Sequence, residues 1–271
     1  MEARLALLRR IDAYLDAAPD GSATPVDVGP LRAFVSHAPW PFYVRPRPDL
    51  DLGAPDAVSA DDVRRAAAIL VEVGQSVSFE WVEQLVPSLR PALVDSGLTA
   101  VSHPLLSLDL IAVPAGAPSR ARVLEPEAPE LVASLAVSDV GFAAAGTGRG
   151  VEGPAERDAV TLDPALLDHV RARIRAGRSV VAVLEDPGDG VVATGWHQPI
   201  GATTEVVGVA TLPAYRRQGA AAEVVVRLLH DARERGCTLA LLSASDDAVA
   251  QVYERVGFTR VGSCGAAEAR A

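Results

Sequence analysis

The chain has 271 residues, a formal net charge of −10 and an isoelectric point near 5.0. This acidic balance argues against a general nucleic-acid binder, which usually presents a basic face, and is compatible with cationic small molecules or peptides as substrates. Since 49% of the residues are hydrophobic and no run of about eighteen apolar residues occurs, the sequence predicts a well-buried core and no membrane span.

Composition also indicates a reducing compartment. All 25 basic residues are arginine, which we interpret as the codon bias of a GC-rich genome. Cys237 and Cys264 lack the spacing of a metal site and are typical of buried thiols. The N-terminal stretch MEARLALLRRIDAYLDAAPD carries acidic residues and no long apolar run, so it predicts an amphipathic helix instead of a signal peptide. We therefore expect a cytoplasmic protein without a bound metal.

Residues 1–117 predict an α/β segment that differs from the rest of the chain. Ser59 and Asp62 form a capping box ahead of an apolar helical stripe. Residues 99–113 predict one or two strands, interrupted by Pro104. The sequence PAGAPSR at 114–120 predicts a linker. Other elements predicted here are a strand at 42–46 and a helix that ends at Gly97.

Residues 118–271 predict a mixed α/β sheet. Asp163 as N-cap, Pro164 at the first helical position and Gly177 as the end mark one helix clearly. The other predicted helices are 128–141, 220 to about 236, and 246–257. The predicted strands are 121–126, 179–186, 190–201, 203–212, 237–245 and 258–266.

The stretch LPAYRRQGAAAEVVVRLL (212–229) predicts an anion site. It places Arg216 and Arg217 beside Gly219 at the start of a helix. The first amides of a helix lack intrahelical partners and carry the positive end of its dipole. A glycine lets a phosphate approach these amides, and the arginines can add charge-assisted hydrogen bonds. The order of a P-loop is absent, so the pattern predicts a different phosphate or pyrophosphate cradle.

A second glycine pattern, G-x-G-x-x-G at Gly148, Gly150 and Gly153, is interpreted as a flexible loop. It follows a helix instead of a strand, and Pro154 and Ala155 open no recognisable element.

The cradle resembles a known family. Its residues RRQGAA resemble the Q/R-x-x-G-x-G/A pattern of the GNAT superfamily of acetyl-CoA-dependent N-acetyltransferases, within the family-like run VATLPAYRRQG. DDAVAQVYERVGF (246–258) is similar to the family's tyrosine helix, although Asp247 stands where the family often has asparagine. The resemblance implies a GNAT-like acyl-CoA N-acyltransferase fold and acetyl-CoA as co-substrate. It also implies these cofactor-binding residues: Val209, Ala210, Thr211, Arg216, Arg217, Gln218, Gly219, Ala220, Ala221 and Asp247.

The resemblance further implies two catalytic residues. Glu205, eleven residues before Arg216, is the expected general base, with a solvated strand carboxylate as an equal reading. His197 and a water chain are the other candidate bases. Tyr253 is the expected general acid for the leaving thiolate, with core packing in a helical stripe as the alternative.

Together these observations predict an acetyl-CoA-dependent N-acetyltransferase at 118–271, which acetylates a primary amine of a small molecule or peptide. Residues 1–117 are expected to form an accessory α/β domain, for which a degenerate GNAT-like unit is one open reading. Its role is left open between a docking platform and a wall of the acceptor site. The alternative function is a non-catalytic GNAT-fold protein that binds or senses acyl-CoA. We expect no nucleic-acid or membrane partner, and we leave homodimer formation open.

Overall fold

The computed structural model describes residues 2–112, 119–144 and 146–268. The chain divides into two compact units. Unit 1 contains Met1–Leu106, Ser243–Asp246 and Arg260–Ala271, and unit 2 contains Ser107–Leu242 and Asp247–Thr259. In the part that the structure describes, none of the helices is long and apolar enough to cross a membrane.

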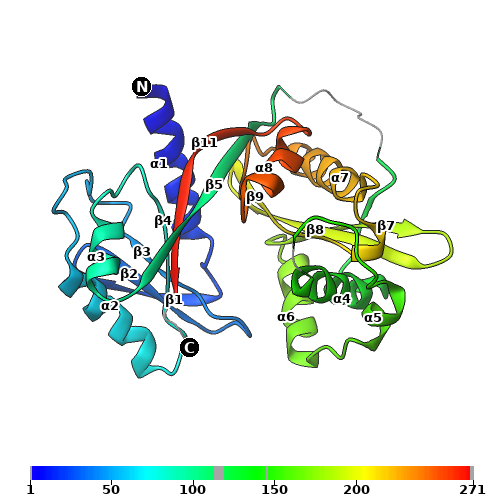
Figure 1. Cartoon of the computed structure of the whole chain (residues 1–271), viewed down its shortest axis with the longest axis horizontal. Coiled ribbons are helices and arrows are strands. Elements are labelled where there is room, and N and C mark those ends of the chain that lie inside the picture. The colour runs from blue at the N-terminus through cyan, green and yellow to red at the C-terminus, as the bar shows by residue number, and fades with distance from the viewer. Residues whose placement is uncertain (1, 113–118, 145, 269–271) are drawn as a thin grey trace. The chain divides into compact units, whose positions relative to one another are not determined.

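The strands of unit 1 lie in the order β1-β2-β3-β4-β11-β5 (Figure 1). β3 runs parallel to β4, whereas β1–β2, β2–β3 and β4–β11 are antiparallel. The elements are α1 (Glu2–Ala17), β1 (Ala23–Val28), β2 (Leu31–Ser36), β3 (Val44–Pro46), α2 (Ala60–Glu72), β4 (Ser78–Val82), α3 (Leu89–Asp95), most of β5 (Thr99–Asp109) and most of β11 (Thr259–Glu268).

An apolar core and a buried ion pair stabilise unit 1. Ser59 and Asp62 form the predicted capping box at the start of α2. The buried face of α2, including Leu70, belongs to the same apolar cluster as Phe79 and Trp81 of β4. Arg45 of β3 is fully buried, and its Nη2 lies 2.5 Å from Oδ1 of Asp12 in α1. A buried charge needs such a partner because desolvation would otherwise cost several kcal/mol.

The strands of unit 2 lie in the order β10-β9-β8-β7-β6. β9 and β10 are parallel, and the pairs β6–β7, β7–β8 and β8–β9 are antiparallel. The elements are β6 (Arg122–Val123), α4 (Glu130–Ala143), α5 (Pro154–Ala159), α6 (Pro164–Arg175), β7 (Val180–Asp186), β8 (Gly190–Ile200), β9 (Thr203–Thr211), the 3-10 turn η1 (Pro213–Tyr215), α7 (Ala220–Glu234), β10 (Leu239–Ser243) and α8 (Asp247–Glu254).

Helices cover both faces of this sheet, with α7 on one side and α4, α5 and α6 on the other (Figure 1). On the α4 side, Leu131 and Val137 join Val181 and Val183 of β7 in one buried cluster. On the α7 side the approach is close at Gly195 of β8. A Cβ at this position would lie 2.8 Å from Val224 and 3.2 Å from Leu228.

The structure confirms the mixed α/β sheet and most predicted elements, including α6 with Asp163 as its N-cap. Of the one or two strands expected over 99–113, the structure has one, β5, which runs through Pro104. One expectation about an element was wrong. Pro154 opens a short helix, α5, whose N3 residue Glu156 caps the Gly153 amide.

The predicted division into 1–117 and 118–271 stays a prediction about separately folding domains. The boundary and residues 114–118 of the predicted linker lie outside the described residues, as does Val113.

Candidate functional site

The candidate site begins where β9 leaves β10. The parallel ladder pairs Leu239 with Thr203 and ends at the pair Leu241–Glu205. Beyond Glu205, no strand of the described residues pairs with this side of β9. The main-chain N–H and C=O groups of 206–210 that face this side are therefore left for another extended chain. The Thr211 carbonyl accepts a hydrogen bond from Nε of Arg216. Val209, Ala210 and Thr211, the predicted main-chain contacts, lie on this part of β9.

A glycine and a bulge accompany the divergence. The β8–β9 register shifts between Thr194 and Trp196. Gly208 on β9 has φ +62°, and a Cβ there would lie 2.9 Å from Cδ1 of Trp196. Bulges bend the strand that carries them and redirect its side chains. Gly208 and Trp196 thus mark the bend of β9 next to its unpaired edge.

The turn after β9 presents an uncapped helix N-terminus. Gly219 is the N-cap of α7 with φ 84° and ψ 0°, and no side chain caps the helix. A Cβ at Gly219 would meet nothing within 4 Å, so the space above these amides is open. Arg217 is the residue with positive φ, 65°, among the described residues other than glycine. Left-handed backbone at a non-glycine residue is costly and is concentrated at functional sites.

The two arginines of the turn have different environments. The Arg217 side chain is exposed and makes no hydrogen bond or ion pair with the residues that the structure describes. Arg216 differs from the sequence expectation, which directed both arginines at an anion. Its guanidinium instead donates to main-chain carbonyl groups of β9, the end of α4 and the loop that follows α4. The acceptors are Thr211, Gly141, Ala144, Gly146 and Gly148.

The second glycine pattern is docked on this turn, which sequence reasoning missed. The Gly150 amide donates to the Pro213 carbonyl at 3.0 Å, and the Ala214 amide donates to the Glu152 carbonyl at 2.9 Å. Nε of Arg149 donates to the Ala214 carbonyl at 2.9 Å. The expectation of a free flexible loop was therefore wrong. The three closely spaced glycines were the available signal, because Gly150 packs where a Cβ would lie 2.7 Å from Cβ of Pro213.

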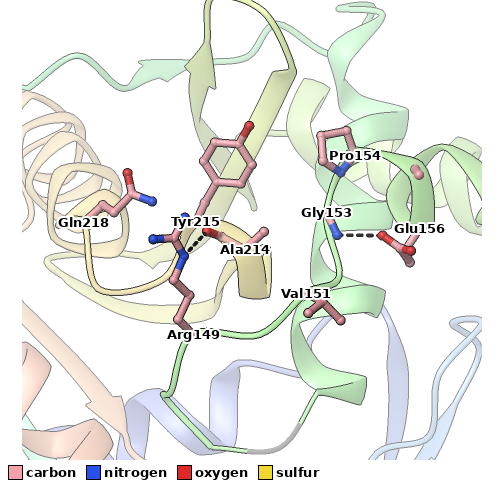
Figure 2. A pocket seen from close by; sticks show the side chains of 9 residues that line it. Arg149, Val151, Gly153, Pro154, Glu156, Ala214, Tyr215 and Gln218 are labelled. Carbon is pink, nitrogen blue, oxygen red and sulfur yellow. Dashed lines mark hydrogen bonds between the residues drawn. The ribbon is translucent and has the colours of Figure 1, made fainter.

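Loop and turn together line a pocket of about 580 Å³. Figure 2 shows Arg149 and Val151 from the loop, Gly153 and Glu156 from the start of α5, and Gln218 from the turn. Gln218 thus joins this pocket to the uncapped amides of α7. The Glu156 carboxyl has a lowered pKa because it accepts a hydrogen bond from the Gly153 amide, so it is a carboxylate at neutral pH.

Glu205 and Tyr253, the predicted catalytic residues, lie on different elements of unit 2. Glu205 is half-buried and occupies the last pair of β9 with β10, the point where the strands part. Tyr253 lies on α8 and packs edge to face on Phe258, with ring centroids 6.0 Å apart. Burial raises the pKa of the Tyr253 phenol to about 12. The hydroxyl makes no hydrogen bond within the described chain, and Asp247 is the exposed first residue of α8.

His197, the alternative base, is a structural residue. It is fully buried on β8. Its Nδ1 lies 2.9 Å from Oγ1 of Thr204, and its Nε2 lies 3.0 Å from Oδ1 of Asp231 on α7. Arg235 forms an ion pair with the same carboxylate. Since both ring nitrogens have partners inside the core, His197 cannot reach an incoming amine.

The sequence and the structure were each found to be similar to known proteins. Residues 152–258 match a family model described as the acetyltransferase (GNAT) family. No curated protein matches the sequence.

Solved structures resemble the chain over nearly its full length. A GCN5-related N-acetyltransferase from Kribbella flavida has a TM-score of 0.70 at 22% identity, covering 97% of this chain and 96% of that chain. One from Sphaerobacter thermophilus has a TM-score of 0.58 at 14% identity, covering 97% and 91%. A conserved protein of unknown function from Staphylococcus epidermidis reaches 0.59 at 13% identity, covering 94% and 96%. At these low identities the TM-scores show a shared fold alone, and they confirm the predicted GNAT-like fold.

The buried network around Asp231 generates a prediction about acid stability. Burial alone would raise the pKa of Asp231, but hydrogen bonds from His197 and Arg235 outweigh it and lower that pKa. The carboxylate therefore contributes stability in full above the unfolded value of 3.8, and this contribution is lost as pH falls through the folded value. We expect Asp231→Asn to lower the free energy of unfolding at pH 7 by about 1–3 kcal/mol and by less at pH 3.

Urea unfolding followed by circular dichroism at both pH values measures the difference. Asp168→Asn is the control, because that carboxylate is 79% exposed on α6 and should leave both values unchanged. An equal loss at pH 7 and pH 3 would contradict the role assigned to Asp231.

Proposed function

We propose, from the match of residues 152–258 to the acetyltransferase (GNAT) family model, that the protein is an acetyl-CoA-dependent N-acetyltransferase acting on a primary amine. The acceptor is a small molecule or peptide. The observation that carries the proposal is the uncapped N-terminus of α7 directly after the unpaired edge of β9. Both lie toward the carboxyl end of β9, beyond the last residue that pairs with the parallel strand β10.

The residues present fit an acyl-CoA in two ways. Its pantetheine arm is an extended chain with amide groups, which can hydrogen-bond to a free strand edge such as that of Val209–Thr211. Its pyrophosphate suits helix amides with open space above them, as found at Gly219, and the unpaired guanidinium of Arg217 adds charge. The main chain from Arg216 to Ala221 would hold this group, with Gln218 beside it. Contact with Asp247 is part of the same proposal.

An acyl-CoA thioester supplies an activated acyl group, and the chain supplies proton transfer. The acceptor enters as an ammonium ion and must lose a proton, since a free alkyl amine has a pKa near 10.4. We assign that proton to the carboxylate of Glu205, directly or through a water molecule. The amine nitrogen then bonds to the acyl carbon, the carbon–sulfur bond breaks, and main-chain N–H groups on the β9 edge stabilise the developing oxyanion.

Tyr253 is assigned to the leaving sulfur as the proton donor. At a pKa of about 12 the phenol keeps its proton throughout the physiological range, so a donor is always present. Moving that proton onto a free thiolate, with a pKa near 8.5, would be uphill. The phenol therefore acts first as a hydrogen-bond donor that stabilises the negative charge developing on sulfur while the carbon–sulfur bond breaks.

We further propose a cytoplasmic location, since both cysteines are buried thiols that form no disulfide. Residues 1–117 are assigned an accessory role, because their sequence holds no counterpart of the RRQGAA cradle.

The acyl-CoA assignment predicts the effect of two substitutions in the turn. Gly219→Val fills the open space above the amides and should abolish acetyl-CoA binding. Arg217→Ala removes one charged donor and should weaken binding by about 10- to 100-fold, in line with about 1.5–3 kcal/mol for a charged hydrogen bond. Isothermal calorimetry with acetyl-CoA measures both.

Gly236→Val is the matched control for Gly219→Val. Gly236 follows α7 with φ +85°, and a Cβ there also meets nothing within 4 Å. Both variants carry the same backbone strain, so loss of binding in both, or in neither, would refute the pyrophosphate site.

Tyr253→Phe tests the proton donor and separates an enzyme from a sensor. Phenylalanine keeps the contact with Phe258 and removes the hydroxyl, so kcat should fall at least about 100-fold while the affinity for acetyl-CoA is unchanged. Steady-state turnover with a panel of amines gives kcat, and an equal melting temperature shows that the fold is retained. Wild-type turnover in the variant would assign Tyr253 to packing. Tight binding without turnover of any amine in the wild-type protein would establish the sensor.

Glu205→Gln tests the general base through its pH dependence. The variant should be slowest relative to wild type near neutral pH and should recover at alkaline pH, because bulk hydroxide then deprotonates the amine. Glu125→Gln is the control, since Glu125 is an exposed carboxylate after β6. A constant ratio of variant to wild-type rates from pH 6 to about pH 10 would exclude Glu205 and leave amine deprotonation to solvent.

A further inference from the structure

Arg216 holds three separate segments through a single guanidinium group. It is half-buried, and its acceptors are main-chain carbonyl groups on β9, on the last turn of α4 and on the loop that follows α4. The distances are 3.4 Å to Thr211, 2.7 Å to Gly141, 3.1 Å to Ala144, 2.9 Å to Gly146 and 3.4 Å to Gly148.

The chemistry of these contacts requires arginine. The last carbonyl groups of a helix lack intrahelical partners and carry the negative end of its dipole, so a cation there is stabilising. Guanidinium presents five N–H donors in a rigid plane, whereas ammonium offers three donors at one point. The planar guanidinium can therefore donate at the same time to carbonyl groups of β9, of α4 and of the loop after α4. Lysine at 216 would keep the charge and lose most of the contacts.

The segment that Arg216 holds continues along the turn. Residues 146–153 are joined to it by the Gly150–Pro213, Ala214–Glu152 and Arg149–Ala214 hydrogen bonds. The loop side of the pocket in Figure 2 is thus fixed to the same turn that leads into α7.

We propose that Arg216 is a positioning residue that docks the glycine loop 146–153 on the turn, so that β9, the turn and the pocket are in place before acyl-CoA binds. Its effect on catalysis rests on the proposed function, whereas its effect on the loop does not. A preordered site binds more tightly because less conformational entropy is lost on binding. Arg217, the same residue type one position later, acts by contrast through its charge on the ligand.

Limited trypsin digestion tests the docking without any ligand. Arg149 lies in the glycine loop, and its Nε is bonded to the Ala214 carbonyl, so cleavage after Arg149 requires the loop to leave the turn. Mass spectrometry of the fragments 1–149 and 150–271 follows the rate. We expect Arg216→Ala and Arg216→Lys each to accelerate this cleavage at least about 10-fold, and Arg217→Ala to leave it at the wild-type rate.

Two controls keep this test decisive. Melting temperatures show whether each variant folds, and Arg216→Lys, which retains the charge, remains informative if Arg216→Ala unfolds. Wild-type cleavage in a folded Arg216→Lys variant would overturn the proposal, since charge alone would then suffice. Equal acceleration in Arg217→Ala would also overturn it.

A truncated donor separates positioning from charge in catalysis. Acetyl-pantetheine lacks the nucleotide and the pyrophosphate. Arg217→Ala should therefore raise KM for acetyl-CoA about 10-fold or more and leave KM for acetyl-pantetheine unchanged. Arg216→Lys should raise KM for both donors with kcat at saturation retained, because the β9 edge and the loop are displaced for either. An effect of Arg216→Lys confined to acetyl-CoA would assign Arg216 to the pyrophosphate instead. If the wild-type protein turned over neither donor while Arg149 stayed protected, the proposed function would fail and the docking role would stand.

Discussion

The end of main-chain pairing between β9 and β10 is the constraint on which the candidate site depends. A parallel pair that continued past Glu205 and Leu241 would use the same N–H and C=O groups that a bound chain needs. The divergence is built into β9 by residues that other side chains could not replace. Gly208 adopts a left-handed conformation against the Trp196 ring, at the register shift where β9 carries one residue more than β8. A larger residue at 208 would collide with the indole, so the bend of β9 depends on a glycine at 208 beside the Trp196 ring.

The adjacent arginines follow from the same geometry. Two like charges in succession repel, yet here the left-handed backbone at Arg217 turns the chain between them. The charge of Arg216 is stabilised by carbonyl dipoles of α4 and the glycine loop. Arg217 is exposed to solvent next to the uncapped amides of α7. The small residues that follow, Gly219 and Ala220, are required for two different structural reasons. Gly219 allows φ 84° at the N-cap, and Ala220 is buried as the helix begins. The turn therefore combines the buried contacts of Arg216 with the proposed anion site on its outer side.

Local signals in the sequence predicted most of the fold and only part of this site. The Ser59–Asp62 box, Asp163 with Pro164, and the apolar, β-branched runs of β7–β9 depend on residues a few positions apart, so a single sequence reveals them. The partners of Arg216 lie about seventy positions away, at Gly146 and Gly141. His197 finds Asp231 thirty-four positions later. No local pattern in the sequence predicts contacts between residues so far apart. For that reason Arg216 was predicted to bind a ligand, His197 was kept as a candidate base, and the glycine loop was expected to be flexible.

The absence of lysine from the sequence, first interpreted as codon bias, has a structural consequence. Arg157 is buried beside the β7–β8 turn and donates to the Asp189 and Val191 carbonyls, as Arg216 does to its own set. Such clamps require the planar guanidinium, and they withdraw positive charge from the surface into contacts with main-chain dipoles. In a chain with net charge −10, the α7 amides and the exposed Arg217 are the positive groups at the proposed anion site. The acidic remainder of the surface favours a cationic acceptor, so the two substrates of the proposed reaction are drawn by fields of opposite sign.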